Sequence, residues 1–225
     1  MTARKTKAAP EPKSEKKSDA ALKVKVLAAA LKAVPFDGFT DKVLNAAAKE
    51  ASADKIQMAR LFPNGPLSLV EAFSESADEA MEKSLAKKKL ATMKVRERIR
   101  AAVWARIDAL RDHKEAARRA GAFLTLPPNA ATGVTLLYRT VDRMWRAVGD
   151  TSTDLNFYTK RAILSGVFSA TLMRWFTDQS EGEADTQAFL DARIENVMQF
   201  EKLKARVKER FGGLPSIAEI LARRT

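Results

Sequence analysis

Residues 26–63 read VLAAALKAVPFDGFTDKVLNAAAKEASADKIQMARLFP, and apolar residues recur in this segment with helical spacing. Val34-Pro35 interrupts the first helical pattern, because the residue before a proline disfavours the helical backbone. Thr40 and Asp54 stand where side-chain caps of two further helices are expected. We therefore predict three short helices in succession, over about residues 20–33, 41–49 and 54–62.

The rest of the chain keeps the helical period, and no run of residues alternates convincingly with the period of a β-strand. Ser68 and Glu71 have the spacing of a capping box, which predicts a fourth helix that opens at Ser68. Gly149 stands where a left-handed residue would end a later helix. Longer helices are expected over about residues 92–110, from there to about 124, 134–148, 155–177 and 185–211, with a short last one after Pro215. The sequence thus predicts an all-α fold.

The composition narrows the class of protein. Of the 225 residues, 46% are hydrophobic, which is enough for one domain or for two small ones that share a core. The chain has no cysteine, so disulfides, thiolate zinc sites and cysteine nucleophiles are excluded. The formal net charge of +12 attracts polyanions, meaning nucleic acid or an anionic bilayer surface, without choosing between them. No apolar run approaches the ~20 residues that a membrane-spanning helix needs.

Charge and apolar content divide the chain into three parts. Residues 1–19 are dominated by Lys, Glu, Ser, Ala and Pro, and we predict a disordered basic tail. Residues 20–75 form a helix-turn-helix-like head, and residues 76–225 form a larger helical body. The tail lacks the Arg-rich amphipathic pattern of an organelle transit peptide. We therefore predict a protein of the bacterial cytoplasm that is peripheral to the inner membrane.

Residues 24–73 resemble the DNA-binding head of TetR-type repressors. Such a head lays its third helix into the major groove of DNA. Two positions depart from the repressor pattern, since Ser52 replaces the usual turn glycine and Ala59 replaces an aromatic residue that contacts phosphate. Asp54 would also be unfavourable beside phosphates. We therefore predict a TetR-like fold without sequence-specific DNA binding.

Four blocks resemble a more specific family, the ubiquinone (coenzyme Q) biosynthesis accessory proteins that are ninth in the coenzyme Q gene series. The blocks are Phe36–Thr40, Leu61–Pro66, Leu126–Ala130 with the helix Leu137–Asp142, and Gly149–Arg161. The last block, GDTSTDLNFYTKR, is the most specific of them. The resemblance extends over about residues 24–205, and the family is itself TetR-like in fold and binds lipids.

The resemblance implies a non-enzymatic carrier without a cofactor. Its ligands would be lipids, including isoprenoid quinones, and it would present them to the di-iron hydroxylase that acts on demethoxyubiquinone. It also implies a partner-docking patch, which maps here onto Phe157, Tyr158, Lys160 and Arg161. Core packing with solvated charges is the alternative interpretation of these four residues. We further expect a homodimer.

The start of the helix after Gly149 has more capping side chains than one helix requires, and we predict that they support its geometry. They are Asp150, Thr151, Ser152 and Asp154. Phe157 and Tyr158 are adjacent on this helix and point roughly 100° apart. One of the two can therefore be core while the other is exposed.

The helix over residues 155–176 is apolar nearly all round, which makes it central. Gly166 permits close approach of a neighbouring helix or an acyl chain, and methionines adapt to irregular ligands. We predict a lipid cavity of several hundred Å³ between this helix and residues 134–148. The candidate lining residues are Val141, Met144, Trp145, Ile163, Gly166, Val167, Met173, Val197 and Met198. Plain core packing is the alternative.

Two basic segments are candidates for contact with an anionic membrane surface. Residues 83–119 carry a lysine run and several arginines, for which a solvated face is the alternative. The last helix forms a short amphipathic surface of the kind that lies on membranes. Its membrane-surface candidates are Ile217, Ile220, Leu221, Arg223 and Arg224.

Catalytic chemistry finds little support in the sequence. His113 is the only histidine, no Glu-x-x-His pair could hold a di-iron site, and no phosphate-binding loop is present. We therefore predict no catalytic residue, no metal site and no enzymatic activity. The alternatives to a lipid-presenting accessory protein are a TetR-type repressor with an apolar effector and a purely structural helical adaptor.

Overall fold

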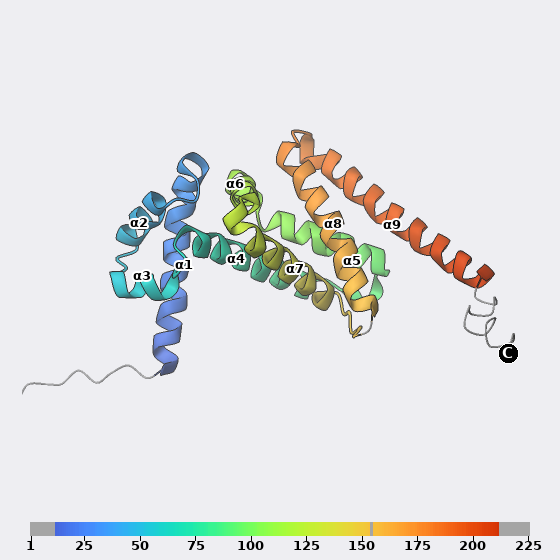
Figure 1. The fold of residues 1–225 in the computed structure, drawn as a ribbon, viewed down its shortest axis with the longest axis horizontal. Helices are drawn as coiled ribbons and strands as arrows, with labels where there is room; N and C mark the ends of the chain where they lie inside the picture. The colour runs from blue at the N-terminus through green and yellow to red at the C-terminus, as the bar shows by residue number, and fades with distance from the viewer. Residues whose placement is uncertain (1–11, 154, 212–225) are drawn as a thin grey trace, which may run out of the picture.

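The computed structural model describes residues 12–153 and 155–211, which form an all-α protein (Figure 1). The α-helices are α1 (Pro12–Asp37), α2 (Asp41–Glu50), α3 (Lys55–Leu61), α4 (Pro66–Ala86), α5 (Val95–Asp108), α6 (Lys114–Thr125), α7 (Ala130–Ala147), α8 (Leu155–Thr177) and α9 (Ala184–Phe211). Short 3₁₀ turns occupy Leu90–Thr92, Arg111–His113, Pro127–Asn129 and Glu181–Glu183. The described residues contain no strand, which confirms the predicted fold class.

The first three helices form the head, at the left of Figure 1. α2 packs against α1 through Val43, which is buried together with Val26. Both predicted caps are present. The Thr40 hydroxyl accepts a hydrogen bond from the amide of Val43 at 3.3 Å, and the Asp54 carboxylate accepts one from the amide of Gln57 at 2.8 Å.

The turn between α2 and α3 contains Ser52, whose φ is +55°. This is the left-handed region of the backbone, which is more costly for a serine than for a glycine. The turn of a repressor-like head is therefore kept here without its usual glycine. The turn is closed by the amides of Ser52 and Ala53, which donate to the carbonyls of Lys49 at 3.1 Å and Ala48 at 2.9 Å.

α1 begins earlier than the sequence predicted. It starts at Pro12, because a proline in the first helical turn loses no helical hydrogen bond. Residues 12–19 are therefore helical, and the prediction of a disordered tail is wrong for them. Residues 1–11 lie outside the described part of the chain.

α1 also ends later than predicted. It continues through Pro35 to Asp37. Pro35 has no amide N–H, but the helical hydrogen bond that is lost belongs to the last turn, where the loss costs least. Gly38 ends the helix with φ +71°, and its amide donates to the carbonyl of Val34 at 2.9 Å. A glycine in the left-handed region therefore terminates the helix where we had expected the proline to do so.

The predicted start of α4 at Ser68 is wrong. The helix begins at Pro66, because Gly65, with φ +57°, turns the chain immediately before the proline. Ser68 is buried inside the helix, where its hydroxyl accepts a hydrogen bond from the amide of Asn64 at 3.1 Å. The hydroxyl thus stabilises the turn that precedes the helix instead of capping the helix itself.

The start of α9 is held by Asp178 and not by Asp185. The Asp178 carboxylate accepts hydrogen bonds from the amides of Ser180 and Thr186, both at 2.8 Å. Burial raises the pKa of Asp178, but the hydrogen bonds from Ser180 and Thr186 outweigh burial and hold it well below its usual range. Asp185 is exposed and pairs with Arg174.

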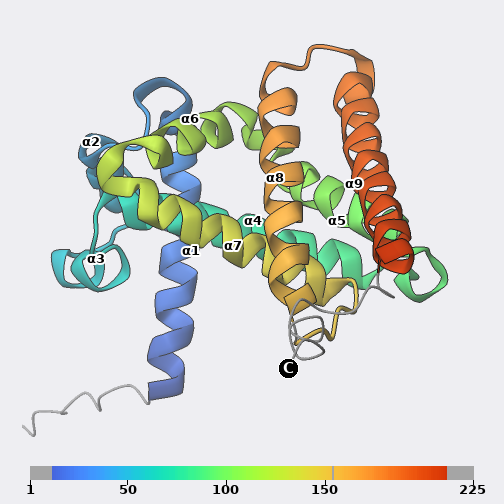
Figure 2. The same ribbon diagram turned by 45° about the vertical axis from the view of Figure 1, so that its right-hand side comes forward.

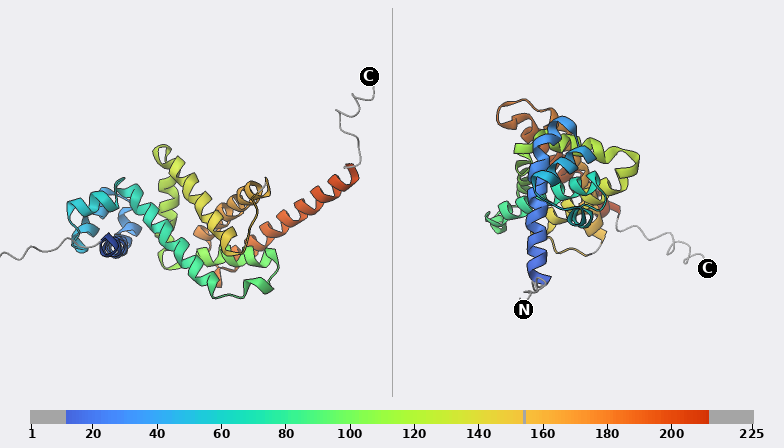
Figure 3. Two further views of the ribbon diagram at one scale, coloured as in Figure 1. Left: turned by 90° about the horizontal axis from the view of Figure 1, so that it is seen from below. Right: turned by 90° about the vertical axis from the view of Figure 1, so that its left-hand side faces the viewer.

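The body consists of α4 to α9. α4, α5 and α7 pack around Met81, Ile107 and Met144, which are completely buried. Figure 2 shows α8 and α9 side by side at the end of the body that is remote from the head, and α9 also contacts α5. The last turns of α9 project beyond the other helices (Figure 3).

A buried ion pair joins α4, α5 and α7. Asp78 of α4 accepts hydrogen bonds from Arg106 of α5 at 2.6 Å and from the Thr140 hydroxyl of α7 at 2.9 Å. Their relative exposures are 4%, 5% and 2%, respectively. Burial lowers the pKa of Arg106, and the charge of Asp78 acts against this shift. Since a buried charge is costly without a partner, each member of the pair depends on the other.

Asp78→Ala should lower the free energy of unfolding by about 3–5 kcal/mol, because it leaves the buried Arg106 guanidinium without its carboxylate. Urea denaturation measures this change. Asp191→Ala is the matched control, since it breaks an Arg100–Asp191 pair of similar length, 2.5 Å, in which both side chains are about half exposed. The control should cost at most about 1 kcal/mol. An equal loss of unfolding free energy in the two variants would contradict the claim that burial makes the Asp78–Arg106 pair important for stability.

Candidate functional site

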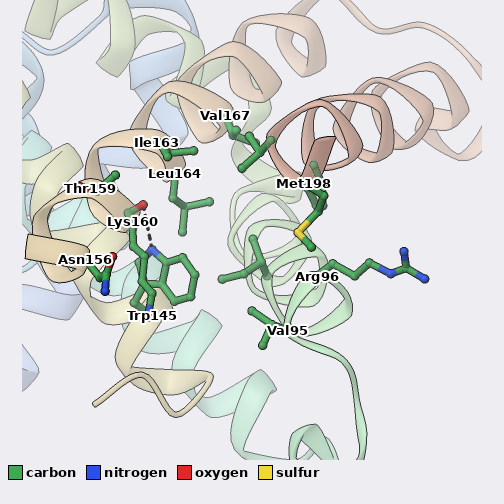
Figure 4. Close-up of a pocket in the computed structure, with 13 residues that line it drawn as sticks. Val95, Arg96, Trp145, Asn156, Thr159, Lys160, Ile163, Leu164, Val167 and Met198 are labelled. Atoms are coloured by element: carbon green, nitrogen blue, oxygen red, sulfur yellow. Dashed lines mark hydrogen bonds between the residues drawn. The ribbon is translucent and has the colours of Figure 1, made fainter. Parts of the chain in front are cut away.

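α5, α7, α8 and α9 surround a pocket of about 320 Å³ (Figure 4). This volume lies at the lower end of the range for small-molecule sites. Most of the lining side chains are apolar: Val95, Ile99, Trp145, Ile163, Leu164, Val167, Ile194, Val197 and Met198. The polar part of the lining consists of Arg96, Asn156, Thr159 and Lys160. Such a pocket suits the apolar part of a ligand.

The structure brings together a part of the predicted cavity residues. Those that line the pocket are Trp145, Ile163, Val167, Val197 and Met198. Val141 and Met144 do not, because they are completely buried in the core between α7 and its neighbours. Gly166 and Met173 are exposed, Met173 to 68%. Neither of the two lines the pocket.

α5 provides a wall of the pocket that the sequence analysis missed. Val95 and Ile99 line the pocket from α5, and Ile194 faces them from α9. The i, i+4 spacing of Val95 and Ile99 indicates an apolar helix face, but this spacing is equally typical of core packing. Val95 and Ile99 line a pocket because α9 packs against α5. The sequence of either helix alone does not reveal this packing.

Trp145 lines the pocket from α7 and is held in place by α8. Its indole N–H donates to the carbonyl of Lys160 at 3.2 Å, as Figure 4 shows. The Lys160 ammonium lies 5.4 Å from the centre of the indole ring, in a cation–π contact. Lys160 also donates to Asp150 at 2.8 Å. The rim of the pocket is therefore tied to the α7–α8 connection.

Arg161 is a buried structural residue and not part of a docking surface, which corrects the role assigned to it. Its side chain is 2% exposed and pairs with Asp142 at 2.7 Å and with Asp150 at 3.2 Å. The guanidinium carbon lies 3.4 Å from the centre of the Phe157 ring. The two carboxylates compensate the buried charge, and the stacking fixes the ring of Phe157.

Tyr158 is the exposed member of the aromatic pair. Its side chain is 64% exposed, whereas Phe157 is half-buried between Arg161 and Tyr158. The two rings meet edge to face, with their centres 5.1 Å apart. Only one of the two residues is exposed, as expected, but Phe157 is half-buried and does not belong to the core. Of the predicted docking residues, Tyr158 is therefore the most accessible, and Lys160 is half-buried beside it.

The polar residues after Gly149 do not act simply as helix caps. Asp150 accepts hydrogen bonds from Ser152 at 2.8 Å and from Lys160 and Arg161. Burial raises the pKa of Asp150, but the hydrogen bonds from Lys160, Ser152 and Arg161 outweigh burial and lower the pKa to about 2. Thr151 is exposed.

Some predictions fall outside the described residues. Asp154, predicted as a capping residue, is one of them. The predicted membrane helix with Ile217, Ile220, Leu221, Arg223 and Arg224 is another. Within residues 12–153 and 155–211, no helix combines the length and the apolar character that crossing a membrane requires. In the same residues, no cluster of three or more His, Cys, Asp or Glu side chains could hold a metal ion.

Comparison with known proteins points to one family. A model of the COQ9 family matches residues 130–201. The ubiquinone biosynthesis protein COQ9-B, mitochondrial, of Xenopus laevis is 32% identical over 201 residues, which cover 86% of this chain and 68% of the relative. The mitochondrial COQ9 protein of Rattus norvegicus is 30% identical over 208 residues, or 88% of this chain. The chain spans 65% of the length of that rat relative.

A solved structure supports the fold. The TetR transcriptional regulator from Nitrosomonas europaea superposes with a TM-score of 0.61 and covers 78% of this chain and 97% of its own. The sequence identity is 17%, so this similarity concerns the fold alone. The predicted TetR-like, all-α fold is confirmed.

The pKa of Asp150 predicts how stability depends on pH. A carboxyl group whose pKa falls from its ordinary 3.8 to about 2 on folding stabilises the protein above pH 4, and this contribution of about 2 kcal/mol is lost as the pH falls from 4 to 2. The Asp150→Asn variant has no ionisable carboxyl group at this position, so it lacks this pH-dependent contribution. Between pH 5 and pH 2, urea denaturation should therefore show a loss for the wild type that exceeds that of the variant by this amount. Parallel pH profiles of the two proteins would refute the assignment.

Proposed function

Because the chain belongs to the COQ9 family, we propose that it is a non-enzymatic accessory protein of ubiquinone biosynthesis that binds isoprenoid quinone intermediates. It presents them, in this proposal, to the hydroxylase that acts on demethoxyubiquinone. The observation that supports this proposal is the mostly apolar pocket among α5, α7, α8 and α9. Its lining residues from α7, α8 and α9 lie within residues 130–201, which match the family model. A polyprenyl quinone is insoluble in water, so its transfer to another protein requires an apolar site of this kind.

The volume of the pocket supports partial burial of such a ligand. At about 30 Å³ per water-sized group, 320 Å³ accommodates on the order of ten non-hydrogen atoms. That number corresponds to one substituted quinone ring or to about two isoprene units. The rest of a long tail would then stay outside, in a membrane or along the surface. A presenting protein needs this property, since its ligand must leave again.

The position of Tyr158 supports a docking surface next to the ligand. Tyr158 is exposed, while the neighbouring Thr159 and Lys160 line the pocket. Its ring packs on Phe157, which Arg161 holds from the other side. An exposed tyrosine with a fixed direction is typical of residues that contribute most to an interface. A hydroxylase bound at Tyr158 would lie close to the entrance of the pocket.

We also propose that the protein is a homodimer that acts peripherally at a membrane. The relatives that it resembles carry mitochondrial names, and the prediction of a bacterial cytoplasmic location stays a prediction. Membrane contact fits the ligand class, because isoprenoid quinones reside in bilayers. Sequence-specific DNA binding is not part of this proposal, since Ala59 stands where the repressor pattern has an aromatic residue.

Ile163→Trp should fill the pocket and exclude the ligand. We expect the affinity for a short-chain ubiquinone analogue, measured by calorimetry, to fall about tenfold or more, which corresponds to at least 1.4 kcal/mol. Lipid that copurifies with the protein, measured by mass spectrometry, should decrease as well. Met173→Trp is the matched control, because Met173 lies on the exposed face of the same helix. Binding that is unchanged in Ile163→Trp would rule out this pocket as the ligand site.

Tyr158→Ala should weaken binding to the hydroxylase about thirtyfold, as truncation of a central interface residue commonly does. Its melting temperature should stay near that of the wild type, because the side chain is exposed. Phe157→Ala should instead lower the melting temperature, since it removes the ring under Arg161. Tyr138→Ala, on α7, is the control, because Tyr138 is the only other tyrosine and is 41% exposed. Surface plasmon resonance with immobilised hydroxylase tests these changes. Equal affinity of the Tyr158 and Tyr138 variants would exclude docking through Tyr158.

A further inference from the structure

Positive charge is concentrated in residues 87–96, which comprise the connection between α4 and α5 and the first two residues of α5 and are called the basic connection here. It contains five cations and no carboxylate: Lys87, Lys88, Lys89, Lys94 and Arg96. All five side chains belong to exposed residues, and among the described residues none of them forms an ion pair. Arg100, one turn further along α5, is by contrast paired with Asp191. The five charges of the connection therefore contribute nothing to holding the fold together.

The connection is nevertheless held in a fixed position by Arg98. Its guanidinium donates to the carbonyls of Met93 at 2.9 Å and Ala91 at 3.1 Å, which lie within the connection. It also donates to the carbonyl of Val148, at the end of α7, at 3.3 Å. Three backbone carbonyls thus share one side chain. The cations are presented on a preformed surface, so binding through them requires little ordering of the chain.

The connection also forms the edge of the pocket. Val95 and Arg96 both line it, and Val95 is 58% exposed. In Figure 4 the Arg96 side chain extends away from Trp145, on the opposite side of the pocket. Leu90, in the middle of the connection, is half-buried against the core. The exposed Val95 is therefore flanked in sequence by Lys94 and Arg96 at the edge of an apolar site.

We propose that residues 87–96 dock the protein on an anionic phospholipid bilayer. Cations that are not neutralised by the protein attract anionic lipid headgroups, and each lysine near the surface strengthens binding about fivefold. Val95 selects the bilayer over other polyanions, because its apolar side chain gains from the acyl region and gains nothing beside nucleic acid. The surface lies at the end of the body opposite the head (Figure 2), so the head would point away from the membrane.

Passage of a lipid from the bilayer into the pocket rests on the proposed function. Docking through Val95 and Arg96 would place the pocket entrance at the level of the headgroups. A ligand could then move between bilayer and pocket without crossing water. The binding of the bilayer itself depends only on the charges and the exposed valine.

The first test compares vesicle binding by the full chain before and after neutralisation of the lysine run. Vesicles of phosphatidylglycerol and phosphatidylcholine should bind the wild type, and pure phosphatidylcholine vesicles should not. The triple variant Lys87→Gln, Lys88→Gln, Lys89→Gln should partition about a hundredfold less onto the anionic vesicles in a sedimentation assay. Retained binding of the triple variant would overturn the proposal.

A matched control separates this surface from overall charge. The variant Lys32→Gln, Lys42→Gln, Lys49→Gln removes three exposed lysines from the head, so both triple variants have a formal net charge of +12 − 3 = +9. The head variant should bind anionic vesicles nearly as well as the wild type. Equal losses in the two variants would mean that net charge alone drives the binding, and the proposal would fail.

The second test places a probe at the predicted contact. The chain has no cysteine, so Val95→Cys can be labelled uniquely with an environment-sensitive fluorophore. Its emission should shift to the blue when anionic vesicles are added. The same label at Val134→Cys should not respond, because Val134, 70% exposed, lies on α7. A shift at position 134 without one at position 95 would place the membrane contact elsewhere and overturn the proposal.

Two further outcomes distinguish this proposal from others. If the wild type ignores anionic vesicles but binds poly-glutamate through the lysine run, the surface docks an acidic protein and the proposal is wrong. Affinity for a quinone analogue, measured without vesicles, reports on the proposed function separately. A protein that binds vesicles through residues 87–96 but binds no quinone would support the docking surface and refute the proposed cargo.

Discussion

The buried guanidinium of Arg161 holds together α7 and α8, the two helices that carry Trp145 and Tyr158. It joins Asp142 of α7, Asp150 of the following connection and the ring of Phe157 on α8. A charge that is almost fully buried is stable only with compensating charges in fixed positions. The angle and the register of α7 and α8 are therefore set by this contact. The Trp145–Lys160 hydrogen bond and the direction of Tyr158 both follow from that register.

The pocket, the exposed Tyr158 and the basic connection of residues 87–96 are neighbours in the body of the protein. Thr159 and Lys160 line the pocket next to the exposed Tyr158, and Val95 and Arg96 line it from the opposite wall. A carrier that takes an apolar ligand from a bilayer and passes it to a second protein needs an entrance, a site and a docking surface within reach of one another. The head takes no part in this arrangement.

The incorrect predictions share a physical cause. Arg161 is typical of a solvated or docking residue in the sequence, because arginines are seldom buried without partners. Its two carboxylates are 19 and 11 residues away along the chain, so no local pattern reveals the burial. The apolar character of α8 nearly all round predicts Met173 and Gly166 in the pocket, but neither lines it. An apolar helix with no polar face gives no indication of which side meets a ligand.

The sequence by itself determined the all-α fold, the caps at Thr40 and Asp54 and the left-handed Gly149. These features depend on residues within one or two helical turns, where spacing and backbone sterics suffice. Only the tertiary structure decided that α5 and α9 complete the pocket and that Arg161 is buried. It also decided that the five cations of residues 87–96 form no ion pair within residues 12–153 and 155–211. Each of these depends on which helices meet, and that is fixed by packing between distant parts of the chain.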